Sequence, residues 1–153
     1  MSNFEKAVRS WLKKNNIDCN ICFEDDFGYQ IDNNTIHIGI MEYENVSHWY
    51  EQLLYEYGLD YVGILAPVLA FTHEIGHYMT INNFTKEELL ICHLTKQFMN
   101  SEDEHDWFNK YWEVPDEFAA NIWAINFINN NIEAVEELCN IYVNYWEEFV
   151  NVA

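Results

Sequence analysis

Residues 73–77 read His73-Glu74-Ile75-Gly76-His77, an H-E-x-x-H run inside a largely apolar segment with helical periodicity. Two histidines four positions apart lie on one face of a helix, so both imidazoles can reach a single zinc ion. Glu74 is next to the first histidine, where its carboxylate could take a proton from a metal-bound water. The competing interpretation is an exposed polar patch on a structural helix, which the apolar surroundings disfavour.

A zinc hydrolase keeps three protein ligands and one open position, so a third ligand must come from elsewhere in the chain. The best candidate is Glu117, because Ala120 and Ala124 follow it one and two turns later on the same helical face. Small residues there would let the helix approach the motif helix closely and bring the glutamate to the metal. The competitors for this ligand position are Asp116, Glu113, His93 and His105.

Length and composition predict one folded domain that spans residues 1–153. Half of the 153 residues are hydrophobic and 17% are aromatic, which favours a packed core over disorder. Residues 1–16 lack the apolar core of a signal peptide, and the longest apolar run, 61–71, is too short to cross a bilayer. We therefore expect a cytoplasmic protein with no membrane contact and with reduced cysteines.

The charge of the chain is strongly negative. There are 26 acidic residues against 7 basic ones, a formal net charge of −19. A phosphate backbone would be repelled, so direct nucleic-acid binding is disfavoured, whereas a basic protein partner would be attracted. Solubility alone is the alternative explanation of this charge.

The first forty residues predict one helix followed by a small sheet. Ser2 and Glu5 form a capping-box pattern, and the helix that follows should end near residue 16. Alternating apolar residues predict strands at 17–23, 29–32 and 35–40 in an antiparallel meander. The turns between these strands are expected at Asp25-Asp26 and Asn33-Asn34.

From Val46 onward the pattern is helical. One helix should end at Gly58, and the motif helix should begin between Tyr61 and Pro67. Further helix starts are expected at capping boxes or at a first-turn proline: Thr85 with Glu88, Ser101 with Glu104, and Pro115, whose helix should run to about Asn129. The order of helix, three strands and many helices indicates an α+β fold, a three-stranded antiparallel sheet with a helical bundle.

The last helix should bury one apolar stripe against the core. That stripe consists of Ile132, Val135, Leu138, Cys139, Tyr142, Tyr145, Trp146 and Phe149.

His73-Glu74-Ile75-Gly76-His77, followed forty residues later by Glu117-x-x-Ala120-Asn121-x-Trp123-Ala124, resembles the ImmA/IrrE family of metallo-endopeptidases. That family has H-E-[LI]-G-H on one helix and E-x-x-A-N-x-F-A on a later one, so Trp123 replaces the usual Phe. The likeness covers roughly residues 17–130 and implies a minimal zincin-like metalloprotease core. It also implies that His73, His77 and Glu117 ligate zinc and that Glu74 is the catalytic base.

Members of that family cleave helix-turn-helix repressors, often in prophages or other mobile elements, so the resemblance implies a basic DNA-binding repressor as substrate. Two other classes of function stay open. One is a catalytically silent protein that binds a regulator without cleaving it. The other is an acidic DNA mimic that occupies a nucleic-acid-binding protein.

Several residues have a second possible role. An oxyanion donor is expected among Tyr78, His93, His105 and Tyr111. The 35–40 strand could pair its edge with an extended substrate. The aromatic residues Trp107, Phe108, Tyr111 and Trp112 are expected in the core rather than around a ligand. The four cysteines, Cys19, Cys22, Cys92 and Cys139, are expected to be buried structural residues.

Overall fold

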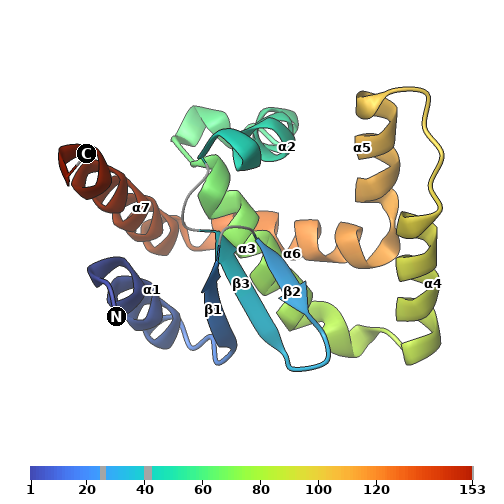
Figure 1. Cartoon of the computed structure of the whole chain (residues 1–153), viewed down its shortest axis with the longest axis horizontal. Helices are drawn as coiled ribbons and strands as arrows, with labels where there is room; N and C mark the ends of the chain where they lie inside the picture. The colour runs from blue at the N-terminus through green and yellow to red at the C-terminus, as the bar shows by residue number, and fades with distance from the viewer. Residues whose placement is uncertain (25–26, 40–42, 153) are drawn as a thin grey trace.

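The computed structural model describes residues 1–24, 27–39 and 43–152 (Figure 1). Within these residues the strands are β1 (Asn20–Glu24), β2 (Gly28–Gln30) and β3 (Thr35–Gly39). The α-helices are α1 (Asn3–Lys14), α2 (Tyr43–Glu56), α3 (Ala66–Thr80), α4 (Lys86–Gln97), α5 (Glu104–Glu113), α6 (Pro115–Asn130) and α7 (Ile132–Val152). Two short 3₁₀-helices cover Asp60–Val62 and Ile81–Asn83. This arrangement confirms the α+β class.

Three of the expectations fall on positions outside the described residues. They are the turn at Asp25-Asp26, the end of the third strand at Ile40, and the side chain of Phe149.

The sheet is mixed, with the strand order β1-β3-β2. β2 and β3 form the expected antiparallel hairpin, and Asn34 in its turn has a left-handed φ of 53°. β1 pairs with the other edge of β3 in parallel, so the predicted antiparallel meander is wrong for β1. The apolar alternation of β3 shows which face is buried, and Ile36 and Ile38 are indeed fully buried. The alternation does not show which strands pair with β3, or whether each pair is parallel or antiparallel.

Helix α3 runs through the middle of the molecule behind the sheet, with α1 and α7 on one side and α4 and α5 on the other (Figure 1). It contacts β2, β3, α2, α6 and α7. Every residue from Ala66 to Gly76 is buried, which explains why this part of the helix has apolar residues on all its faces besides the polar Thr72, His73 and Glu74. Pro67 lies in its first turn, as predicted, where a missing N–H costs nothing.

The N-terminal helix α1 packs against α7. Its predicted capping box is present, because Ser2 Oγ accepts the Glu5 N–H and the Glu5 carboxylate accepts the Ser2 N–H. Its apolar stripe is buried, and Trp11 Nε1 donates to the Ala134 carbonyl of α7 at 2.7 Å.

The stripe predicted for α7 is only partly correct. Val135, Leu138 and Tyr142 are buried, whereas Ile132 and Trp146 are 38% and 48% exposed. The buried part of the stripe is thus its middle, whereas Ile132 at the start of α7 and Trp146 nearer its end are partly exposed.

The other helix boundaries are set by caps. Thr85 accepts the Glu88 N–H at the start of α4, as expected. The N-cap of α5 is Asp103, which accepts the Asp106 N–H, so the Ser101–Glu104 capping box is wrong. Aspartate caps as well as serine, and the chain uses the later of the two sites. Gly58 follows α2 with a left-handed φ of 67°, as a helix-ending glycine should. No helix in the described ranges has the length and apolarity needed to cross a membrane.

Candidate metal centre

Helix α3 presents the motif residues toward the side of the molecule that α6 covers. His73 is 2% exposed, Glu74 is 6% exposed, and His77 one turn later is partly buried. The two imidazole rings lie 4.7 Å apart between centroids and nearly perpendicular to each other. The four-residue spacing thus places both rings on one face, as the sequence predicted.

Helix α6 brings Glu117 to the two histidines because the helices α3 and α6 approach to backbone contact. Ala120 and Ala124 are fully buried at the crossing, which confirms the predicted small-residue approach. The partner of Ala120 is Gly76: a Cβ added there would lie only 2.4 Å from the Ala120 carbonyl oxygen. Glycine inside the H-E-x-x-H run is therefore a packing requirement, which the motif spacing alone does not indicate.

The donor atoms of His73, His77 and Glu117 converge. Glu117 Oε2 lies 2.9 Å from His73 Nε2 and 3.0 Å from His77 Nε2. The three ligand atoms all fall within 4.8 Å of one another, so these residues could hold a metal ion. Two imidazoles and a carboxylate suit a borderline ion such as zinc, for which a tetrahedral site needs neighbouring donors about 3.3 Å apart. To reach that spacing, Glu117 Oε2 would have to withdraw from each imidazole by a few tenths of an ångström.

Asn121 orients the first histidine. Its side-chain oxygen lies 2.7 Å from His73 Nδ1, so Nδ1 donates to it. Nε2, which bonds to Glu117 Oε2 in this structure, is then the nitrogen that could ligate a metal. Asn121 is 3% exposed and stands four residues after Glu117, on the same face of α6. That spacing was visible in the sequence and could have revealed this role.

The second carboxylate oxygen of Glu117 is also held. Glu117 Oε1 accepts a hydrogen bond from Lys96 Nζ at 2.8 Å and one from the Tyr111 hydroxyl at 2.9 Å. Neither residue was singled out as a neighbour of Glu117, since α4 and α5 reach α6 only through the tertiary fold.

The charges in this cluster stabilise one another. Burial opposes ionisation of Glu117, but hydrogen bonds from His73 and His77 outweigh it and hold the pKa of this carboxyl well below its usual range. Burial also opposes the charge on Lys96, yet the neighbouring carboxylates raise the pKa of its ammonium. Burial, followed by the charge of Glu117, raises the pKa of the Tyr111 phenol, so Tyr111 stays a protonated donor.

Aromatic rings enclose the histidines. Trp112 and Tyr50 lie edge-on to His73 at centroid distances of 5.3 and 6.0 Å, and Tyr29 of β2 stacks on His77 at 6.2 Å. Phe108 is buried, as expected of a core residue. Trp112 packs against the hydrophobic core, as expected, and also contacts His73. Tyr111 was expected in the core as well, but its hydroxyl binds Glu117.

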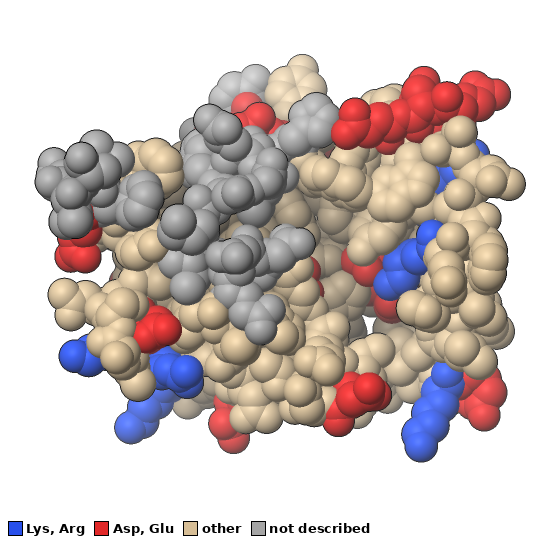
Figure 2. All heavy atoms as spheres, in the orientation of Figure 1, with Lys and Arg blue, Asp and Glu red and all other residues tan. Residues whose placement is uncertain are grey.

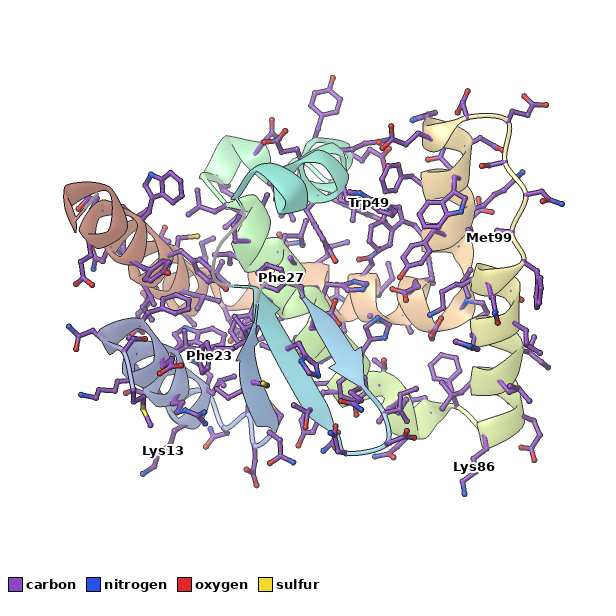
Figure 3. All side chains as sticks on the ribbon, in the orientation of Figure 1. Lys13, Phe23, Phe27, Trp49, Lys86 and Met99 are labelled. Carbon is purple, nitrogen blue, oxygen red and sulfur yellow. The ribbon has the colours of Figure 1, made fainter. Side chains whose placement is uncertain are left out.

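Trp49 extends this aromatic group. It reaches from α2 to Trp107 and Phe108 of α5 (Figure 3).

The four alternative metal ligands named from the sequence are not part of the cluster of His73, His77 and Glu117. Asp116 pairs with Lys96 through one oxygen and accepts the Glu117 N–H with the other. Glu113, His93 and His105 are exposed, and His105 contacts Gln52 instead.

Two further expectations are corrected or narrowed. The Tyr78 hydroxyl donates to the Asp18 carbonyl, whereas the Tyr111 hydroxyl lies beside the cluster and donates to Glu117 Oε1. β3 is the central strand, so the predicted docking of a substrate on its edge is wrong.

The four cysteines form no disulfide. Cys92 is buried as expected, whereas Cys19, Cys22 and Cys139 are only partly buried.

A scan against protein-family models finds no match, and searches of curated proteins and of solved structures find none either.

Proposed function

We propose that this protein is a zinc-dependent endopeptidase that hydrolyses peptide bonds of a protein substrate. The observation that supports the proposal best is the convergence of His73, His77 and Glu117, with the Glu74 carboxylate buried on the same helix. Two imidazoles and one carboxylate are a donor set of catalytic zinc sites, which keep a fourth position for water or substrate.

A zinc ion held there would supply Lewis-acid activation of water and of the scissile carbonyl. Glu74 is the general base in this proposal: it accepts the proton of the attacking water and passes it to the leaving amine.

Tyr111 is the donor that we assign to the developing oxyanion. Its hydroxyl donates to Glu117 Oε1 at 2.9 Å in this structure and would have to turn from that oxygen to the developing oxyanion. Its raised pKa keeps it protonated. The charge of Glu74 contributes to that raised pKa, so the base and the donor are electrostatic neighbours. A base and an oxyanion donor on one site are what peptide hydrolysis requires.

The free edge of β2 is the substrate-docking surface in this proposal. Among the described strands β2 pairs only with β3, and Tyr29 of β2 stacks on His77. An extended peptide that adds to this edge would pass beside the proposed metal. Figure 2 shows a hollow in this face of the molecule next to α4, with acidic and basic atoms at its margin.

The substrate class that we propose is a cationic protein, with a DNA-binding repressor as the candidate that the family resemblance implies. The net charge of −19 favours such a partner. Charge steering raises the encounter rate and is screened by salt, with a Debye length of about 8 Å at physiological ionic strength.

The test of the proposed reaction compares the zinc-loaded wild-type protein with Glu74→Gln on a mixture of unfolded cationic and neutral polypeptides, with cleavage followed by mass spectrometry. Glu74→Gln should keep zinc and lose cleavage by roughly 100-fold or more. The matched control is Glu113→Gln, an exposed acid on α5, which should cleave normally. Cleavage by Glu74→Gln at the wild-type rate would exclude Glu74 as the base. Binding without any cleavage by the wild type would favour a silent or DNA-mimicking interaction protein.

A further inference from the structure

Lys96 is a basic residue whose side chain points into the molecule. Its side chain is 22% exposed, and its ammonium lies 2.8 Å from Asp116 Oδ2 and 2.8 Å from Glu117 Oε1. It stands one turn after Cys92, the buried residue of α4, on the face that contacts α6. By contrast, Lys86 at the start of the same helix points away from the molecule (Figure 3). Lysine side chains are rarely buried, and this chain has only 7 basic residues, so the inward orientation of the Lys96 ammonium needs an explanation in its surroundings.

The two oxygens of Glu117 have separate partners. Oε2 is directed to His73 and His77, and Oε1 accepts hydrogen bonds from Lys96 and Tyr111. A carboxylate held in this way cannot turn both oxygens toward one ion. We infer that Lys96 is a positioning residue that fixes Glu117 so that it offers Oε2 alone to the metal. This inference rests on the proposed metal site and not on the peptidase reaction.

The local charge supports the same conclusion. Asp116 and Glu117 are adjacent, 9% and 3% exposed, and Lys96 bridges them. Without that ammonium two neighbouring buried carboxylates would repel each other, and Glu117 would turn away from Asp116. Tyr111 supplies one hydrogen bond to Oε1 but no charge, so it cannot replace Lys96.

A purely structural role would give a different result. If Lys96 only tethers α4 to α6, its removal lowers the stability of the metal-free protein and leaves the zinc affinity of the folded protein unchanged. If it positions Glu117, zinc affinity falls, because partners that hold metal ligands are typically worth 10- to 100-fold in metal affinity. The two roles therefore separate in one measurement of affinity on folded protein.

The experiment uses the full chain with Lys96→Met, Lys96→Arg and, as the matched control on the same helix, Lys86→Met. Zinc affinity is measured by competition with a chromogenic chelator, and folding by circular dichroism without metal. Lys96→Met should bind zinc about 10- to 100-fold more weakly. Lys96→Arg, which keeps a charge that can bridge two carboxylates, should recover most of the loss, and Lys86→Met should match the wild type.

Cobalt(II) substitution gives a second readout. The visible absorption bands of the cobalt protein should change in Lys96→Met, because the freed carboxylate can present both oxygens, and should be restored in Lys96→Arg.

Wild-type or tighter affinity in folded Lys96→Met would overturn the inference. If that variant does not fold, Lys96→Met combined with Asp116→Asn removes the unpaired buried charge, and unchanged affinity there would overturn it equally. Zinc binding without peptide cleavage would refute the proposed peptidase reaction but would not affect the inference about Lys96. A wild-type protein that binds no zinc would refute both.

Discussion

Gly76→Ala tests the close approach of α3 and α6 on which the candidate site depends. The added Cβ would lie 2.4 Å from Ala120 O, 2.9 Å from Ala120 Cα and 3.0 Å from Ala120 C. All three atoms are backbone atoms, so no side-chain rotation relieves the clash. To reach an ordinary contact of 3.4 Å the helices must separate by about 1 Å.

Two opposing effects set the change in stability. Alanine in place of glycine stabilises a helix by roughly 1 kcal/mol. Overpacking against a rigid backbone costs roughly 1–3 kcal/mol, and a 2.4 Å contact belongs at the upper end of that range. We expect a net loss of about 2 kcal/mol in the free energy of unfolding, or roughly 4–8 °C in Tm for a domain of this size.

The effect on metal binding should be larger than the effect on the fold. A shift of about 1 Å moves Glu117 on α6 relative to both histidines on α3, whereas metal–ligand distances tolerate only about 0.2 Å. Zinc affinity, measured by chelator competition, should therefore fall by more than tenfold while the far-ultraviolet circular dichroism spectrum stays helical.

The matched control is Gly28→Ala, because a Cβ at Gly28 meets nothing within 4 Å. It should leave both the Tm and zinc affinity near the wild-type values. If Gly76→Ala also retains wild-type stability and zinc affinity, the backbone contact between α3 and α6 does not hold the site together and the reasoning fails.

Three further predictions concern single side chains. Asn121→Ala removes the acceptor for His73 Nδ1 and should weaken zinc binding by about 10- to 100-fold, measured by chelator competition; an unchanged affinity would remove Asn121 from the site. Tyr111→Phe should lower kcat by roughly 100-fold or more with little change in KM, whereas a loss confined to zinc affinity would mean that Tyr111 only supports Glu117. Burial raises the pKa of the Cys19 thiol to about 11, so its alkylation at pH 8 should be roughly 100-fold slower than in urea and should accelerate as the pH rises toward 11. Equal alkylation rates in the folded and unfolded protein would contradict that burial.

The parts of the site that were predictable from sequence follow local helical geometry. The spacing of His73 and His77 fixes their common face, whatever packs on them. Glu117 was predictable because Ala120 and Ala124 mark the face of α6 on which another helix can approach closely. In both cases the residue spacing within one short helical segment is enough to predict which side chains share a face.

The missed residues depend on contacts between distant segments. Lys96 reaches Glu117 from α4, and nothing in its own helix indicates a neighbour 21 residues away. Tyr111 was among the oxyanion candidates, but its hydrogen bond to Glu117 was not predicted. The parallel pairing of β1 with β3 was missed for the same reason, since alternation defines faces but not partners. The role of Asn121 could have been predicted from the sequence, because Asn121 lies one turn after Glu117 on the same face of α6.

The most direct test is the zinc content of purified protein, determined by mass spectrometry of the metal after exhaustive dialysis, for the wild type, Glu74→Gln and Glu117→Ala. The proposed site predicts one zinc per chain in the wild type and in Glu74→Gln, since Glu74 is not a ligand. It predicts far less zinc in Glu117→Ala, where only His73 and His77 would be left to bind the ion. Absence of zinc from the wild type, or full retention by Glu117→Ala, would contradict the three-ligand site.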